Sequence, residues 1–302
     1  KPSPTLKAMR RRVLERWPKA RWVWYDATEV DEVRRGSEIA FGAPRHELLH
    51  LSKAKVIVSL DRDFLGNEPR GVAHHREFAA TRRVMSVHDE MSRVYAVESY
   101  LSATGGMADH RLRLAPSQVS AFARALYRRV MAITGKGAAA AGASEVPAEW
   151  NDWLDAITED LESHLGASLI VAGKSQPAAV HAMVHAMNEA LGNVGTTVTY
   201  AEMDEDDAAS SAAALADLCG AMRSGAVTTL VTLGANPVYN APADLGFAEA
   251  FKGVATKITL SLDPNETVAA SDWRLGAAHA LESWGDTRTA DGVVAPVQPM
   301  IA

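Results

Sequence analysis

The same order of helices and short apolar strands occurs twice along this chain. In the first half, residues 54–60 and 93–97 have the composition of short strands. In the second half, residues 228–233 and 257–262 occupy the same places in the order. Short apolar strands that alternate with helices are typical of parallel sheets covered on both faces. We therefore predict the α/β fold class, built as an internal duplication of a parallel-sheet unit.

The flanking segments extend the repeat. Helices are expected at residues 5–17 and 178–191, each leading to a strand, at residues 21–25 and 196–200. A further helix is expected at residues 208–223. The order of elements thus matches along both halves, which supports the internal duplication.

A stretch rich in glycine and alanine, residues 134–147, separates the halves and is typical of a linker or mobile loop. We therefore predict a first α/β unit at residues 1–133 and a second at residues 148–302. The second begins with an apolar strand at residues 168–172 that has no counterpart before Lys1. Because a missing parallel strand exposes backbone groups, we expect an exposed apolar edge in the first unit and a chain that is a fragment.

Charge and composition narrow the class of partner. The net charge of -6 and the pI of about 5.9 favour neither nucleic acid nor an anionic membrane surface as partner. No apolar run approaches the roughly 20 residues that span a bilayer, so no direct membrane span is expected. The single cysteine, Cys219, excludes an intrachain disulfide and a cysteine-held iron–sulfur cluster within this chain. It lies in an alanine-rich helical stretch and is expected to be buried.

Four short patterns suggest chemistry only weakly. Gly173-Lys-Ser175 lacks the earlier glycine of a phosphate loop, where Ser168 stands, and is predicted to be a strand-to-helix turn. His181 and His185 lie four residues apart without an intervening glutamate and are predicted to be a groove or surface pair. His74-His75 is expected in a solvated loop. His279 and Glu282 have the spacing of an acid/base pair, without a nearby nucleophile.

Gly234-Ala-Asn-Pro237 is more informative, because it follows a predicted parallel strand, where open α/β sheets place their ligands. Glycine permits a tight turn, Asn236 can bond neighbouring backbone groups, and Pro237 fixes the direction in which the chain leaves. Glu266, Thr267 and Asp272 follow the next strand. A ligand-binding edge and a simple well-built turn both remain possible from these residues.

Taken together, these segments resemble the molybdopterin oxidoreductases. That family has a strand followed by Gly-x-Asn-Pro and then a Glu-Thr-Ala-x-x-Ala-Asp-like segment, and this chain has Gly234-Ala-Asn-Pro237 and Glu266-Thr-Val-Ala-Ala-Ser-Asp272. The resemblance implies Rossmann-like units, as in the middle domains of formate dehydrogenase and DMSO reductase. It also implies molybdopterin guanine dinucleotide as the family's cofactor. The residues that would contact it are Gly234, Asn236, Pro237, Glu266, Thr267 and Asp272.

Within that superfamily, the chain resembles the B subunit of bacterial alternative complex III. The resemblance is carried by Ser59-Leu-Asp-Arg-Asp-Phe-Leu65, Thr104-Gly-Gly-Met-Ala-Asp-His-Arg111 and Leu281-Glu-Ser-Trp-Gly-Asp286. It implies a membrane-bound quinol:electron-acceptor oxidoreductase, with this subunit on the periplasmic side of the bacterial inner membrane. The partners would be the other subunits, and the iron–sulfur clusters would belong to a ferredoxin-like part outside this chain.

The departures from the family pattern point away from a bound cofactor. Asp61-Arg-Asp63 stands in place of Gly-x-Asn-Pro, Glu98-Ser-Tyr100 in place of Asp-Pro-Arg, and Pro116-Ser-Gln118 in place of Pro-Gly-Thr-Asp. Carboxylates repel a doubly phosphorylated ligand. We therefore expect a scaffold that lacks the cofactor and is not itself catalytic. Two alternatives remain: an active enzyme that binds a pterin guanine dinucleotide at the strand carboxyl ends, and a small-molecule-binding module that uses the crevice at residues 234–237.

Overall fold

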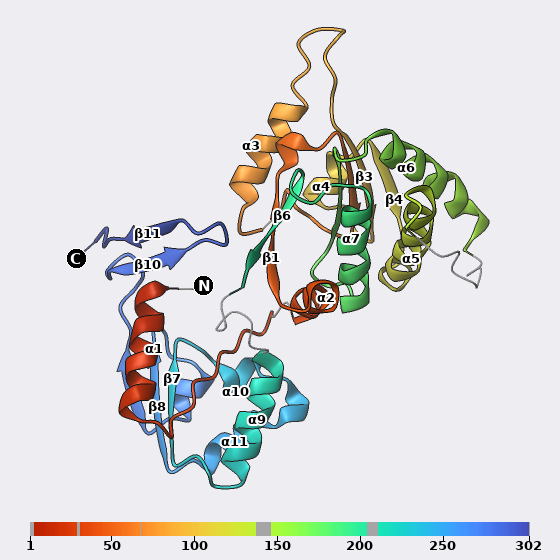
Figure 1. Cartoon of the computed structure of the whole chain (residues 1–302). Coiled ribbons are helices and arrows are strands. Elements are labelled where there is room, and N and C mark those ends of the chain that lie inside the picture. The colour runs from red at the N-terminus through yellow and green to blue at the C-terminus, as the bar shows by residue number, and fades with distance from the viewer. Residues whose placement is uncertain (1–2, 29–30, 67, 137–145, 204–210, 302) are drawn as a thin grey trace. The chain divides into compact units, whose positions relative to one another are not determined.

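The computed structural model describes residues 3–28, 31–66, 68–136, 146–203 and 211–301. The chain folds into two compact units, each with its own parallel sheet (Figure 1). We call residues 32–203 the central unit, and residues 1–31 together with 204–302 the terminal unit. Helices alternate with parallel strands in both units, which confirms the predicted α/β, Rossmann-like class.

The central unit contains a four-stranded parallel sheet with the order β4-β3-β2-β5. Alternate residues of its inner strands enter different cores: Val58 and Leu60 of β2 pack into one, and Ile57 packs into the other. Both faces are therefore covered, as a parallel sheet requires. The strands are β2 (Val56–Leu60), β3 (Arg93–Glu98), β4 (His110–Arg113) and β5 (Ser168–Ala172).

Helices supply the remaining core of the central unit. On one face, α5 (Pro116–Ile133), α6 (Asn151–Ser163) and α7 (Ala178–Ala190) pack against the sheet through side chains that include Phe122 and Leu154. On the other face, Phe64 and Phe78 pack edge to face, with ring centroids 6.1 Å apart. The elements on this side include η1 (Leu51–Lys53), α3 (Gly71–Thr81) and the short α4 (Ala103–Gly106).

The strand predicted to open a second unit, β5, instead completes the first sheet. It pairs in parallel with β2, so that Ser168 lies opposite Val56. The expected exposed edge is therefore wrong, because β5 occupies the place of the missing strand. The compact units also do not follow the predicted boundaries at residues 133 and 148: the chain leaves the central unit only at residue 203. Residues 137–145 of the predicted linker lie outside the described residues.

Polar side chains bond the backbone along the outer edge of β5. Asn188 Oδ1 accepts a hydrogen bond from the Ile170 N–H (3.0 Å), and Asn188 Nδ2 donates to the Ile170 carbonyl (2.7 Å). Asn193 Oδ1 accepts from the Ser168 N–H (3.3 Å), and Thr197 Oγ1 donates to the Ser168 carbonyl (2.6 Å). These bonds satisfy backbone groups that an unpaired edge would leave without partners.

Two strand predictions need correction. The strand predicted at residues 196–200 is found at β6 (Val198–Glu202), but it pairs antiparallel with β1 (Arg45–Leu49), a strand that the sequence reading missed. Residues 21–25 form no strand. Val23 and Tyr25 pack instead against the apolar core of the terminal unit, so burial of their side chains replaces strand pairing.

The terminal unit contains a three-stranded parallel sheet with the order β7-β8-β9, formed by β7 (Thr229–Leu233), β8 (Thr256–Ser261) and β9 (Trp273–Gly276). Leu215 and Cys219 pack with Phe251 in its core, so the prediction that Cys219 is buried is confirmed. The other elements are α1 (Pro4–Arg16), α9 (Ser211–Arg223), α10 (Pro237–Asn240), η3 (Ala243–Leu245), α11 (Phe247–Lys252), α12 (Glu266–Ala269), β10 (Gly285–Arg288) and β11 (Val294–Val297).

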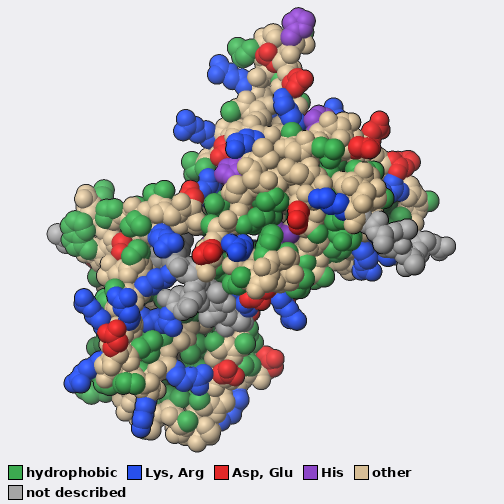
Figure 2. Space-filling model, in the orientation of Figure 1, with side chains coloured by type: hydrophobic (Ala, Val, Ile, Leu, Met, Phe, Trp, Pro, Cys, Tyr) green, Lys and Arg blue, Asp and Glu red, His purple; other side chains and the backbone are tan. Residues whose placement is uncertain are grey.

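Two features of the surface bear on partners. Among the described helices, none combines the length and apolar composition needed to cross a membrane. On the face drawn in Figure 2, acidic and basic side chains are interspersed with apolar ones.

Candidate functional site

The predicted turn Gly234-Ala-Asn-Pro237 lies at the carboxyl end of β7. Gly234 has a φ of 64°, a left-handed conformation that glycine adopts at low cost. Pro237 begins α10, where its fixed φ suits the first turn of a helix. Asn236 Oδ1 accepts hydrogen bonds from the Thr267 N–H (3.1 Å) and from Thr267 Oγ1 (2.8 Å). The turn after β7 is thereby tied to the start of α12, which follows β8.

Glu266 joins the same turn. Asn236 Nδ2 donates to Glu266 Oε2 (2.7 Å), and this hydrogen bond is the main reason that the pKa of the exposed Glu266 carboxyl is lowered. Thr267 Oγ1 also accepts from the Val238 N–H (3.1 Å). The structure therefore brings Gly234, Asn236, Pro237, Glu266 and Thr267 together at the carboxyl edge of the sheet.

Asp272 does not join them. It precedes β9, at the amino edge of the sheet, where its Oδ2 accepts from the Lys257 N–H (2.8 Å) and lies 3.2 Å from Lys257 Nζ. The backbone hydrogen bond is the main cause of a lowered pKa for this carboxyl. Asp272 therefore links the starts of β8 and β9 and faces away from any ligand at the opposite edge.

The central unit contains the same turn in a different sequence. Asp61 follows β2 with a φ of 61°, the left-handed conformation of Gly234. Asp63 Oδ1 accepts from the Thr104 N–H and from Thr104 Oγ1 (2.8 Å each). Thr104 Oγ1 in turn accepts from the Leu65 N–H (3.0 Å).

The three hydrogen bonds of Thr104 have counterparts in the terminal unit. Asp63 corresponds to Asn236, and Thr104 corresponds to Thr267. The correspondence continues at the amino edge, where the Val94 N–H donates to Asp109 Oδ2 (2.8 Å), as the Lys257 N–H donates to Asp272. The predicted internal duplication is thus visible bond by bond, and Asp61-Arg-Asp63 does stand where the second half has Gly234-Ala-Asn236.

The Asp61 carboxylate is held by the turn after β5. Asp61 Oδ2 accepts from Gln176 Nε2 (3.0 Å) and from Ser175 Oγ (3.3 Å). The two turns pack so closely that a Cβ added to Gly173 would lie 1.9 Å from the Asp61 carbonyl oxygen. Gly173-Lys-Ser175 is therefore the strand-to-helix turn that was predicted, and its polar groups face a carboxylate of the same chain.

The other two departures from the family pattern are also bonded within the unit. Glu98, which is 5% exposed, accepts hydrogen bonds from Ser102 Oγ and Arg111 Nε, each at 2.5 Å. Pro116 begins α5, and Gln118 Oε1 accepts from the Ala115 N–H (3.2 Å) at the start of that helix. Glu98 and Gln118 are thus engaged in holding the local backbone.

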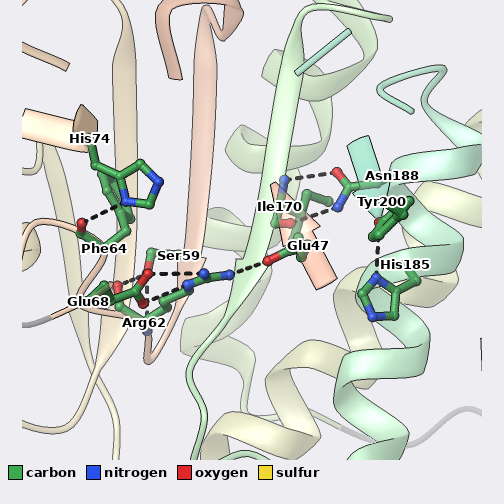
Figure 3. Close-up of polar contacts among 10 residues, drawn as sticks. All are labelled: Glu47, Ser59, Arg62, Phe64, Glu68, His74, Ile170, His185, Asn188 and Tyr200. Carbon is green, nitrogen blue, oxygen red and sulfur yellow. Dashed lines mark hydrogen bonds and ion pairs between the residues drawn. The ribbon is translucent and has the colours of Figure 1, made fainter. Parts of the chain in front are cut away.

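Arg62, between the two aspartates, is paired on both sides (Figure 3). Its Nε and Nη2 donate to the Glu68 carboxylate (2.8 and 3.0 Å), and its Nη1 donates to Glu47 Oε2. Burial disfavours the charged guanidinium, but Glu47 and Glu68 outweigh it and raise the Arg62 pKa. Burial likewise opposes ionisation of Glu47, but Arg62 outweighs that effect and the Glu47 pKa is lowered. Two carboxylates therefore hold the cation of this turn.

His181 and His185 are buried, so the prediction of a groove or surface pair is wrong. His185 Nδ1 lies 3.0 Å from the Tyr200 hydroxyl. The centroids of the His185 and Phe41 rings are 5.1 Å apart. Burial lowers the pKa of His181 to about 4 and also lowers that of His185. The cause is tertiary: α2 (Asp31–Phe41) and β6 cover this side of α7, and helical spacing alone does not reveal that cover.

The remaining histidine predictions are resolved individually. His74 is buried in α3, with Nδ1 3.3 Å from the Phe64 carbonyl, so the expected solvated loop pair is wrong, although His75 is exposed. In the exposed segment at His279, Glu282 Oε2 accepts from the His279 backbone N–H (2.8 Å) rather than from its imidazole. Across the part of the chain that the structure describes, no three His, Cys, Asp or Glu side chains are grouped to hold a metal ion.

The sequence reading missed Glu47, Glu68 and Asn188. Glu47 lies on the unrecognised strand β1. Asn188 carried a usable signal, because it continues the four-residue spacing of the buried Val180 and Val184. A polar residue at that position of an apolar helix face requires a buried hydrogen-bond partner, which is Ile170.

Comparisons with known proteins establish similarity of fold. No family model matches the chain, and no curated protein matches its sequence. Acetylene hydratase from Pelobacter acetylenicus has a similar structure over 91% of this chain, with a TM-score of 0.62 and 9% sequence identity. The formyltransferase/hydrolase complex from Methylorubrum extorquens, solved with methylofuran, matches over 89% with a TM-score of 0.50 and 14% identity. The chain spans 48% of the first protein and 76% of the second.

Proposed function

We propose that this chain is the molybdopterin-oxidoreductase-like part of a membrane-bound electron-transfer complex of the alternative complex III type. In this proposal it is a scaffold that binds no molybdopterin guanine dinucleotide and performs no catalysis. It contacts other subunits on the periplasmic side of the bacterial inner membrane. The support consists of the sequence motifs at residues 59–65, 104–111 and 281–286, together with a fold that fits a molybdopterin-related protein.

The observation that carries the proposal is the chemistry of the turn after β2. A cofactor with two phosphates needs backbone N–H groups and cations at the carboxyl edge of the sheet. The central unit presents Asp61 and Asp63 there, and its Arg62 is already paired with Glu47 and Glu68. Because like charges repel, these residues do not fit the cofactor.

One observation favours a second candidate function. The terminal unit keeps Gly234, Asn236 and Pro237 in the predicted arrangement, beside Glu266 and Thr267. An active pterin-dependent oxidoreductase would use this edge. However, both ends of the Asn236 side-chain amide are already bonded, to Thr267 and to Glu266, so a ligand would have to displace one of them.

Metal and pterin analysis of the purified parent complex distinguishes the two functions. The scaffold proposal predicts iron without stoichiometric molybdenum or tungsten, and no fluorescent pterin after oxidative release. Molybdenum or tungsten at one per complex, together with pterin, would overturn it. Pull-down with the tagged chain should also recover membrane-bound redox subunits of the same organism.

Calorimetry on this chain tests the small-molecule alternative. Titration with guanine nucleotides and with pterins should give no heat of binding under the scaffold proposal. If heat is observed, the Asn236→Ala variant shows whether the turn after β7 is responsible, and Asn151→Ala, in α6 of the central unit, is the matched control.

A further inference from the structure

We infer that Glu32 and Asp61 occupy, as built-in anions, the positions that a bound phosphate would take at the amino end of α7. In Rossmann-like sheets, the turn between a strand and the following helix binds anions through backbone N–H groups and the helix dipole. The turn from β5 to α7 offers three donors: the N–H of Ala178 and the side chains of Ser175 and Gln176. Its donors are directed at two carboxylates of the central unit itself.

Asp61 supplies the first carboxylate. Its Oδ2 accepts hydrogen bonds from Gln176 Nε2 (3.0 Å) and Ser175 Oγ (3.3 Å), which lie shortly before α7. Gln176 is 3% exposed, and its Oε1 has no hydrogen-bond partner within the described residues. Burying an amide is costly unless its groups are bonded. The hydrogen bond to Asp61 Oδ2 thus stabilises the Gln176 side chain in this place.

The backbone at Asp61 points to the same role. Among the described residues, Asp61 is the one non-glycine residue with a positive φ, whereas its counterpart in the duplicated turn is Gly234. Aspartate tolerates the left-handed region better than most residues, but glycine adopts it at lower cost. A turn that needs only this conformation would be more stable with glycine. An aspartate there is explained by what its carboxylate contacts.

Glu32 supplies the second carboxylate. Its Oε2 accepts from the N–H of Ala178, the first residue of α7, at 2.7 Å. This N–H lies at the positive end of the helix dipole. The approach of α2 that allows the contact depends on Gly36, because a Cβ there would lie 2.3 Å from His181 Cβ and 2.8 Å from the Ala178 carbonyl oxygen.

The cations Arg62 and Lys174 do not neutralise these two carboxylates. Arg62 points its guanidinium to Glu47 and Glu68, and Lys174 is exposed. The anion position at the amino end of α7 is therefore occupied by carboxylates of the same unit. Occupation by carboxylates goes beyond the loss of a cofactor, because loss alone would leave the donors at α7 to solvent. The inference rests on contacts within the central unit and does not depend on the parent complex.

Removing both carboxylates should create an anion site. The variant Glu32→Gln with Asp61→Gly keeps the size of residue 32 and the left-handed backbone at residue 61. Titration of the whole chain with inorganic pyrophosphate at low ionic strength, followed by calorimetry and by amide NMR shifts, measures the result. We expect affinity at least about tenfold above wild type, or about 1.4 kcal/mol. The shifts should centre on the amides of Ser175 and Ala178.

The control has the same change in charge at a distance. Asp152→Asn with Glu162→Gln neutralises two exposed carboxylates of α6 and should bind pyrophosphate no better than wild type. Equal gain in both variants, or a folded test variant with no gain, overturns the inference. Should the double variant unfold, Glu32→Gln alone must still strengthen binding and shift the Ala178 amide, and failure there is equally decisive. Molybdenum in the parent complex would overturn the proposed function and leave this result unchanged.

Discussion

Asp61 and Gly234 adopt the same left-handed backbone conformation, with φ of 61° and 64°, at equivalent turns of the two sheets. The two halves of the chain therefore share one turn geometry. The second half has glycine there, the residue that adopts this geometry most easily, and the first half has aspartate. In the terminal unit the turn has a glycine and an amide, and in the central unit it has two carboxylates. The difference lies in charge rather than in backbone.

Gly234→Ala should destabilise the terminal unit by roughly 1–2 kcal/mol, because an L side chain is disfavoured at this φ. Apart from its chain neighbours, no atom of the described residues lies within 4 Å of the added Cβ, so the loss reports the backbone conformation. Urea unfolding measures it. Gly276→Ala is the control, since that position is equally open and has no positive φ, and its change should stay within about 0.5 kcal/mol. Equal effects of both substitutions would contradict the prediction.

Asn188→Leu should destabilise the central unit by roughly 2–4 kcal/mol. It leaves the N–H and carbonyl of Ile170 buried without their partner, and each unsatisfied group costs about 1–3 kcal/mol. Amide hydrogen exchange at Ile170 should accelerate more than at Val58, inside the sheet. Asn151→Leu, which removes a half-buried bond from Arg129, is the matched control and should cost less than about 1 kcal/mol. An unchanged exchange rate at Ile170 would show that Asn188 does not protect this edge.

Arg62→Met should cost roughly 3 kcal/mol or more, because it leaves Glu47 and Glu68 in a largely buried site without their cation. Replacing all three charges, by Glu47→Gln, Arg62→Met and Glu68→Gln, should recover much of that loss. Unfolding free energies of the single and triple variants make the comparison. A triple variant less stable than Arg62→Met would mean that the ion pairs themselves stabilise the unit.

The stability of the central unit should fall as the pH is lowered from 6.5 towards 4. Burial lowers the pKa of His181 to about 4 from its ordinary 6.5. Between these values the unfolded chain binds a proton that the folded chain does not, so acidification favours unfolding, by up to about 1.4 kcal/mol per pH unit for one such group. His185 and His74, whose pKa values burial also lowers, act in the same direction.

Urea unfolding at several pH values tests this dependence. Glu47, whose pKa is lowered from 4.5, affects stability mainly below about pH 5, so the range from about 6.5 to 5 reports chiefly on the histidines. His181→Gln should flatten the slope there, and His88→Gln, at an exposed loop, should not. The same slope in wild type and His181→Gln would show that His181 is not the linked group.

Local pattern was sufficient for much of this protein. The alternation of apolar strands and helices predicted the α/β class, and the strand at residues 168–172 is found at the predicted residues. The matched order of the two halves predicted that Asp61-Arg-Asp63 and Gly234-Ala-Asn-Pro237 are equivalent turns. These features depend on contacts close in sequence and on side-chain periodicity, which the order of residues contains directly.

Tertiary structure decided the partners of each element. An apolar strand such as β5 can pair with any strand of suitable register, and its place beside β2 is determined by which edge is free and by Asn188, which satisfies its other side. In the same way, His181 and His185 are buried because α2 and β6 cover them. Arg62 is unavailable because it pairs with Glu47 of β1, a strand outside the four-stranded sheet. The sequence by itself determined the α/β class, most of the elements and the two equivalent turns. The strand β1, the pairing of strands, the burial of charges and the closure of the anion position at α7 came only with the packed chain.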